Sequence, residues 1–220
     1  MIQAVFQNNN FIVCNKPAEV LSVPAREKSD GRPCLGTGLQ QELKTQIFPV
    51  HRLDYEVSGL IIYALNAKAH QVSQSWFEKK IIQKTYIAET IEQNFSHWPS
   101  NIPTDRTPLI TEEGKSYIWK TRILRGKKRS FESPHGEWAE TKARIVQNLP
   151  VKLVWSLMPV TGKSHQLRLE LSRRGFPIHG DILYGSSVKS NGAGISLKAV
   201  QIDLTQIEDR LGLPELIGLP

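Results

Sequence analysis

The chain has 220 residues, of which 40% are hydrophobic and 22% charged, so it can bury a core without disulfides or a metal. A formal net charge of +7 and a pI near 9.4 favour an acidic partner, nucleic acid foremost. Apolar runs are too short to span a membrane, and the N-terminus lacks a secretory signal pattern. Cys14 and Cys34 lack metal-ligand spacing and are expected to be free thiols. We therefore expect a cytoplasmic protein that needs no membrane.

The first half of the chain predicts strands that alternate with short helices. Residues 11–17 form an apolar run that ends at Asn-Lys-Pro, and the glycine-punctuated residues 31–43 lead into a short helix. Residues 60–65 predict a buried strand. Asn66 then suits the N-cap of an amphipathic helix, whose apolar residues fall three and four apart. Residues 84–90 alternate as a further strand.

The second half begins with a polar stretch at 93–116, interpreted as an irregular excursion or a short hairpin. Residues 139–149 and 151–160 predict two strands joined by a Leu-Pro turn. Ser164 is predicted to cap a helix that runs through Arg174 and stops at Gly175. The mixture indicates an α+β fold in which strands dominate.

The densest basic patch is KTRILRGKKR at 120–129, with six Lys or Arg residues in ten. Two interpretations stay open for it. It is either a solvated surface turn or a segment that contacts phosphates.

Several catalytic patterns fail on spacing. The Gly-Lys-Ser triplets at 114–116 and 162–164 lack the earlier glycine of a phosphate-binding loop, because Leu109 and Leu157 stand there. No histidine pair has metal-ligand spacing, so no metal site is expected. Ser58 lies in Val-Ser-Gly, which is not a hydrolase elbow.

Asp54 stands out because it lies in HRLDYEVSGL, residues 51–60, immediately before an apolar strand. An isolated aspartate there would serve as a helix cap or as an ion-pair partner of Arg52. A second polar stretch, residues 161–185, has the density of an active-site segment and contains Arg168. A pairing between Arg168 and Asp54 would favour an ionised carboxylate, which can act as nucleophile or general base. A lone carboxylate argues against glycoside hydrolysis, which needs two acids.

Four motifs in order resemble the RluA/RsuA-type pseudouridine synthases, the RluA branch in particular. They are NKPAEVLSVP (15–24), HRLDYEVSGLIIYALN (51–66), Lys84-Thr85-Tyr86, and TGKSHQLRLEL with GFPIHGDILYG (161–171 and 175–185). Together they cover roughly residues 11–200. The resemblance implies the pseudouridine synthase catalytic fold, a mixed, largely antiparallel sheet with flanking helices, as a single domain over residues 1–220. It leaves no room for the separate N-terminal RNA-binding domain of many relatives.

The resemblance also implies the activity, which is isomerisation of uridines in structured RNA, ribosomal or transfer, after base flipping. Asp54 would attack the uridine, Tyr86 would stack on the base, and Arg168 would pair with Asp54. Arg52 would fill the space left by the flipped nucleotide. From its own chemistry, His51 is expected to orient the loop by hydrogen bonding and has no proton-transfer role. The expected RNA-binding residues are His51, Arg52, Lys163, His165, Arg173 and Arg174. Neither a cofactor nor a metal is expected, and the protein is expected to be a monomer.

Three departures from the family pattern bear on substrate contacts. Val57 stands where the family usually has Thr, Lys163 where it has Arg, and Lys198 where it often has His. Asp181, between Gly180 and Gly185, is interpreted as a structural turn residue. The alternative function is a non-catalytic RNA-binding or RNA-folding protein on the same scaffold. A hydrolase that uses Asp54 is disfavoured because a second acid is missing.

Overall fold

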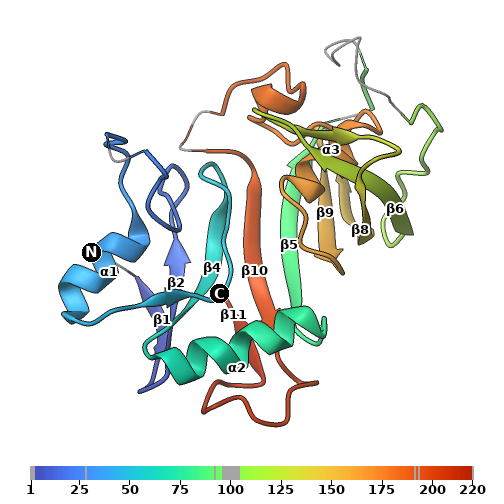
Figure 1. Cartoon of the computed structure of the whole chain (residues 1–220). Coiled ribbons are helices and arrows are strands. Elements are labelled where there is room, and N and C mark those ends of the chain that lie inside the picture. The colour runs from blue at the N-terminus through green and yellow to red at the C-terminus, as the bar shows by residue number, and fades with distance from the viewer. Residues whose placement is uncertain are drawn as a thin grey trace. The chain divides into compact units, whose positions relative to one another are not determined.

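The computed structural model describes residues 3–27, 29–91, 93–95, 105–190, 192 and 194–219. The chain forms two compact units. Unit 1 comprises Met1–Lys84 and Lys198–Pro220, and unit 2 comprises Thr85–Leu197 (Figure 1). The polar stretch predicted at 93–116 lies partly outside the described residues, and its described part from 105 to 115 holds no helix or strand.

Unit 1 is built on mixed strand pairing. Its strands are β1 (Ala4–Gln7), β2 (Phe11–Lys16), β3 (Phe48–Pro49), β4 (Ser58–Ala64), β10 (Leu197–Asp203) and β11 (Leu216–Gly218). β2 lies antiparallel to β1 and to β4 along the whole length of β4. β3 pairs antiparallel with the end of β4, whereas β10 runs parallel to its beginning and carries β11 antiparallel on its other end. The predicted strands at 11–17 and 60–65 are therefore confirmed as β2 and β4.

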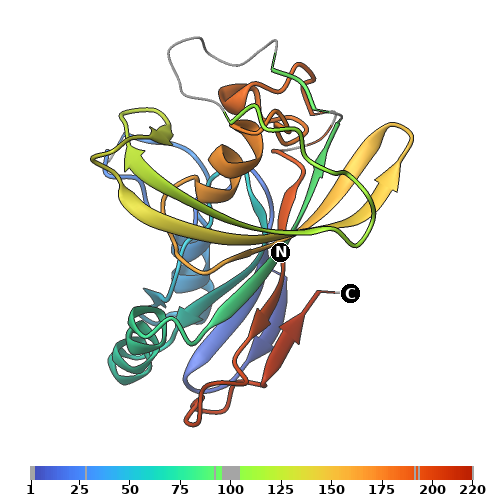
Figure 2. The same ribbon diagram turned by 90° about the vertical axis from the view of Figure 1, so that its right-hand side faces the viewer.

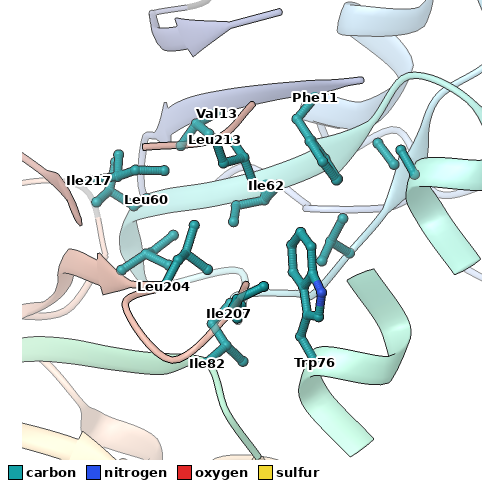
Figure 3. Close-up of a cluster of buried hydrophobic side chains, with 14 residues drawn as sticks. Phe11, Val13, Leu60, Ile62, Trp76, Ile82, Leu204, Ile207, Leu213 and Ile217 are labelled. Atoms are coloured by element: carbon teal, nitrogen blue, oxygen red, sulfur yellow. The ribbon is translucent and has the colours of Figure 1, made fainter. Parts of the chain in front are cut away.

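Two helices complete unit 1, α1 (Leu35–Leu43) and α2 (Ala67–Glu78). The predicted cap of α2 is confirmed, because the Asn66 side-chain oxygen accepts a hydrogen bond from the Ala69 N–H at 2.9 Å. Trp76 points from α2 into the apolar core, where its ring lies 5.7 Å from that of Phe11 (Figure 3). This packing explains the helical spacing of apolar residues seen in the sequence.

Unit 2 is an antiparallel array in the order β5, β9, β8, β6, β7. The bounds are β5 (Gln83–Thr90), β6 (Ser116–Arg125), β7 (Ser130–Glu132), β8 (Glu137–Leu149) and β9 (Lys152–Pro159). The predicted strands at 84–90, 139–149 and 151–160 are thus confirmed. β6 and β8 form a long two-stranded ribbon, yellow-green and yellow in Figure 2. Trp155 of β9 is fully buried and packs against Trp119 and Phe176.

The helix of unit 2, α3 (Gln166–Ser172), is shorter than predicted. Ser164 does not cap it. The residue before the helix is His165, in the left-handed region with φ 54°, and no side chain caps the N-terminus. The Ser164 carbonyl instead accepts a hydrogen bond from the Ser130 hydroxyl at 2.7 Å. The predicted stop at Gly175 is confirmed by its φ of +83°, which favours glycine, and by a bond from the Phe176 N–H to the Leu171 carbonyl.

The mixed, largely antiparallel strands with flanking helices confirm the predicted α+β class. Both cysteines are free thiols, as expected from their spacing. Within the described ranges, no helix has the length and apolar character that crossing a membrane would need.

Candidate active site

The Asp54 loop joins β3 to β4 in unit 1 and is held by Ser22. The Ser22 hydroxyl accepts a hydrogen bond from the Leu53 N–H at 3.0 Å and donates one to the Leu53 carbonyl at 2.8 Å. On the other side, the Val57 N–H donates to the Asp54 carbonyl at 3.2 Å and closes a turn. The backbone of Asp54 is therefore fixed from both directions, and the residue as a whole is half-buried.

Lys16, the last residue of β2, is a buried cation beside this loop. Its side chain has no exposed surface, and Nζ donates to the carbonyls of Pro17 at 2.8 Å, Val20 at 2.7 Å and Tyr55 at 3.4 Å. Burial lowers the pKa of Lys16 to about 8, while the negative charge of Asp54 acts in the opposite direction. Lys16 thus ties the loop backbone and supplies positive charge to Asp54.

The sequence reasoning did not assign Lys16 a role. The sequence signal for such a role is the Asn-Lys-Pro that opens the first motif, because it places Lys16 at the end of an apolar strand. A lysine at the end of an apolar strand is seldom fully buried without partners for its ammonium group.

Beyond the turn, β4 comes close to β10 at Gly59. Gly59 has φ +114°, and a Cβ at this position would lie 2.2 Å from the Ala199 carbonyl oxygen of β10. The departure Val57 is buried, so this side chain faces the interior of unit 1. Lys198 is exposed and lies opposite Ser58 in the parallel β4–β10 pair. Of these two departures, Lys198 is the one open to a substrate.

His51 is buried in unit 1, and its Nε2 accepts a hydrogen bond from the Ile62 N–H of β4 at 3.2 Å. Its ring also packs on Phe77 at 5.7 Å. Burial, with the nearby positive charge of Lys84, holds the pKa of His51 well below its usual value, so the ring is neutral. This hydrogen bond ties His51 to β4, and both the orienting role of His51 and its contact with RNA stay predictions. Arg52 is exposed on the same loop.

In unit 2, Arg168 on α3 forms a two-pronged ion pair with Asp181. Its Nε donates to Asp181 Oδ2 at 2.7 Å and its Nη2 to Oδ1 at 2.8 Å, and both residues are 1% exposed. The guanidinium group also lies 5.1 Å from the centre of the Tyr184 ring. Two parallel hydrogen bonds to one carboxylate fix the orientation of the planar Arg168 guanidinium group. The predicted pairing of Arg168 with Asp54, which lies in unit 1, stays a prediction.

Asp181 was predicted as a turn residue only. The turn is present, because Gly180 and Gly185 have φ of +87° and +93°. The missed function of the carboxylate, as partner of Arg168, had no local signal, because the two residues lie on different elements.

Tyr86 lies on β5 opposite Leu157 of β9, and it is 6% exposed. The alternation of residues 84–90, from which a strand was predicted, is confirmed by β5. Stacking of its ring on a base stays a prediction.

Lys163 and His165 lie at the start of α3, where Gln166 organises the loop. The Gln166 Oε1 accepts hydrogen bonds from the Lys163 N–H at 3.0 Å and from the Thr161 hydroxyl at 2.8 Å. The Lys163 ammonium pairs with Glu137. His165 Nδ1 lies 3.0 Å from the Tyr184 hydroxyl. His165 thus connects the loop to the ring on which Arg168 packs.

Arg173 and Arg174, both predicted to bind RNA, are buried among carboxylates of unit 2. Arg173 pairs with Glu132, and Arg174 pairs with Glu170 and stacks 4.4 Å above the Trp119 ring. Burial lowers the pKa of Arg174, although the Glu170 charge acts against this shift. The described partners of both side chains are protein groups, and RNA contact by either stays a prediction.

Among the residues that the structure describes, no group of three or more His, Cys, Asp and Glu side chains is placed to hold a metal ion.

Comparison with known proteins identifies the fold first. The solved structure named Human RNA Pseudouridylate Synthase Domain Containing 1 is similar over 100% of this chain and 83% of its own, with a TM-score of 0.75 at 20% identity. The chain therefore has the fold of the pseudouridine synthases. The model of the RNA pseudouridylate synthase family matches residues 10–173, so the chain belongs to this family of isomerases, as the motifs predicted.

Two relatives in bacteria carry the name Dual-specificity RNA pseudouridine synthase RluA. The protein from Yersinia pestis is 30% identical over 210 residues, which is 93% of this chain and 92% of the relative. The protein from Vibrio vulnificus (strain CMCP6) is 30% identical over 187 residues, 83% of this chain and 68% of the relative. These similarities confirm the RluA branch of the resemblance.

Proposed function

We propose that this chain isomerises specific uridines of structured RNA, ribosomal or transfer, to pseudouridine, with Asp54 as the nucleophile. The observation that carries the proposal is the Asp54 loop, which Ser22 clamps at Leu53 and beside which Lys16 is buried. A carboxylate in a fixed place beside a cation is suited to covalent catalysis. The names of the relatives support an RNA substrate.

The reaction exchanges one bond for another inside a single nucleotide. Asp54 forms a transient bond to the uridine, and the bond from uracil N1 to the ribose C1′ breaks. C5 of the detached uracil then joins C1′ and the bond to Asp54 is released, while the proton on C5 leaves and N1 gains one. The isomerisation involves no net oxidation or reduction and consumes no second substrate, so the proposal needs no cofactor. A stacked uridine must first be flipped out, which costs a few kcal/mol.

We propose that Tyr86 stacks on the flipped uracil and that Arg168 supports the charge of Asp54. Stacking on an aromatic ring is typically worth about 1–3 kcal/mol per base. The exposed Arg52 would enter the space that the uridine leaves, and Lys163 and His165 would contact the RNA backbone. His51 would act indirectly, by orienting the loop.

The family match at residues 10–173 runs through both units, which supports one catalytic domain over residues 1–220. We propose that this domain acts as a monomer in the cytoplasm.

The proposal is tested with purified protein and RNA that carries tritium at C5 of uridine, isolated from a strain that lacks this gene. The unchanged protein should release tritium, and the Asp54→Asn variant should release none. Glu56→Gln is the matched control, because it removes a carboxylate two positions away and should keep most of the activity. Unchanged release by Asp54→Asn would overturn the assignment of the nucleophile. Binding without release from any RNA would favour the non-catalytic alternative.

A further inference from the structure

One face of the β6–β8 ribbon in unit 2 is open to solvent and rich in cations. Residues of β6 alternate strictly, so that Trp119, Thr121 and Ile123 are buried while their neighbours are exposed. The buried side packs on α3 through Leu169. The exposed members of this face, here called the outer face, are Ile118, Lys120, Arg122 and Leu124 on β6 and Trp138, Lys142 and Arg144 on β8.

The register of the ribbon places these side chains in cross-strand pairs. Lys142 lies opposite Ile118, and Trp138 lies opposite Arg122. Directly opposed residues of an antiparallel pair point to the same side of the sheet, so cations and large apolar groups alternate along the outer face. An acidic residue also belongs to this row, because Glu140 lies opposite Lys120 and pairs with it at 3.4 Å.

Trp138 is the most informative residue of the outer face. Its side chain is 59% exposed, and the Arg122 guanidinium group lies 4.8 Å from its ring centre. A large indole in solvent loses the stabilisation that burial would supply, so its place in a strand suggests a partner that covers it. The Arg122 guanidinium group beside this ring could contact the phosphate of a base that stacks on the open face of the indole.

The basic turn at 120–129, whose role the sequence left open, continues the outer face. Arg125 belongs to the other side of β6, where its guanidinium group lies 3.5 Å from His165 Nε2. The ribbon ends in the turn between β6 and β7, where Lys127 and Lys128 are exposed. Their positive charge extends the row of Lys120, Arg122, Lys142 and Arg144 beyond the strand end.

We propose that the outer face is a second RNA-binding surface, which holds phosphates with its Lys and Arg side chains and stacks an unpaired base on Trp138. This inference rests on the proposed function, because it assigns the surface to the same structured RNA. The charge decides the class of partner. Protein interfaces are depleted of lysine in their centre, whereas RNA backbones need a row of cations.

The test measures the dissociation constant for an unmodified transfer RNA transcript at several salt concentrations. The test variant replaces Lys120, Arg122, Lys142 and Arg144 with Gln. The control variant replaces with Gln four exposed lysines that are not on the outer face, namely Lys44, Lys68, Lys79 and Lys189. It lowers the net charge by the same four units as the test variant. Each lost phosphate contact removes about 0.7–0.9 from the slope of log K against log salt. The slope of the test variant should therefore be less steep by about 3, and that of the control by less than 1. Circular dichroism checks that both variants are folded.

Trp138→Ala supplies a second readout, because loss of one stacked base should weaken binding about five-fold or more. Ultraviolet cross-linking should join the transcript to a peptide that contains Trp138. Equal salt slopes for the test and control variants, with no cross-link at Trp138, would overturn the proposal. A dimer that dissociates in the test variant would instead assign the face to a second copy of the chain and would also overturn it. Tritium release, measured in parallel, tests the catalytic function independently of this surface.

Discussion

Replacing Ser22 with alanine tests whether the Asp54 loop must be held in place. The Ser22 hydroxyl is buried and serves both backbone groups of Leu53, which is itself 7% exposed. The substitution removes both bonds and leaves a buried N–H and a buried carbonyl without their partner. A buried polar group that loses its partner typically costs about 1–3 kcal/mol. We therefore expect the free energy of unfolding to fall by about 2–4 kcal/mol.

The same change should slow catalysis more than it weakens binding. A displacement of about 1 Å at a reacting group can cost about 100-fold in rate. Under single-turnover conditions with saturating protein, we expect pseudouridine formation by Ser22→Ala to be about 10- to 100-fold slower. The dissociation constant for RNA should change by less than about two-fold, because Ser22 is not on the surface.

Ser75→Ala is the matched control. Its hydroxyl donates one hydrogen bond to the Val72 carbonyl at 2.8 Å within α2, away from the Asp54 loop. Urea unfolding and the single-turnover rate should both be nearly unchanged. Ser22→Ala with the unfolding free energy and rate of the unchanged protein would refute the clamp. A loss of stability with a full rate would refute the link between the clamp and catalysis.

Three further substitutions test other parts of the account. Burial lowers the pKa of Lys16 from 10.5 to about 8. Between pH 8 and 10.5 the folded chain therefore binds fewer protons at Lys16 than the unfolded chain does. The contribution of Lys16 to the free energy of unfolding consequently rises with pH. In urea titrations, the free energy of unfolding of the unchanged protein minus that of Lys16→Met should rise by about 3 kcal/mol from pH 8 to 10.5. A difference that stays constant with pH would contradict this prediction. Gly59→Ala forces a Cβ against the Ala199 carbonyl and should cost at least about 2 kcal/mol in the same assay, so a stable variant would contradict the close strand approach. Asp181→Ala leaves the buried Arg168 charge without its carboxylate and should lower the free energy of unfolding by about 3 kcal/mol. The loss should appear as a lower midpoint of thermal unfolding. An unchanged midpoint would show that stability does not depend on the pair.

The parts of the fold that the sequence predicted are those with local causes. β2 and β4 are short apolar runs with turn residues at their ends, and α2 has a capping Asn66 and apolar residues at helical spacing. Each of these preferences arises within a few residues of the chain, so the predicted strands and helix are present in the folded structure. The parallel pair of β4 and β10 had no such signal, because its partners, such as Gly59 and Ala199, are far apart in the sequence.

The start of α3 shows how tertiary contacts override a local preference. Ser164 is a good capping residue, but its carbonyl is bound by Ser130 and the loop before the helix is tied by the Gln166 side chain. The helix therefore begins after His165, which takes the left-handed conformation.

The candidate site divides in the same way. Asp54 is a candidate because its motif is local and distinctive. The contact of Lys16 with the Asp54 loop depends instead on the Tyr55 carbonyl, which is distant in sequence and which the fold brings near. Arg173 and Arg174 look like exposed cations at the end of a helix. Their burial follows from carboxylates such as Glu132, which a strand distant in sequence supplies.

The central claim is that this chain makes pseudouridine with Asp54, and the most direct measurement maps pseudouridines in ribosomal and transfer RNA of a strain that lacks the gene. The account predicts that one or a few sites are lost and return when the unchanged gene or the Glu56→Gln control is supplied. The same sites should stay unmodified with Asp54→Asn, provided that this variant accumulates to the same level. Restoration of the sites by Asp54→Asn, or a map that does not change when the gene is removed, would contradict the account.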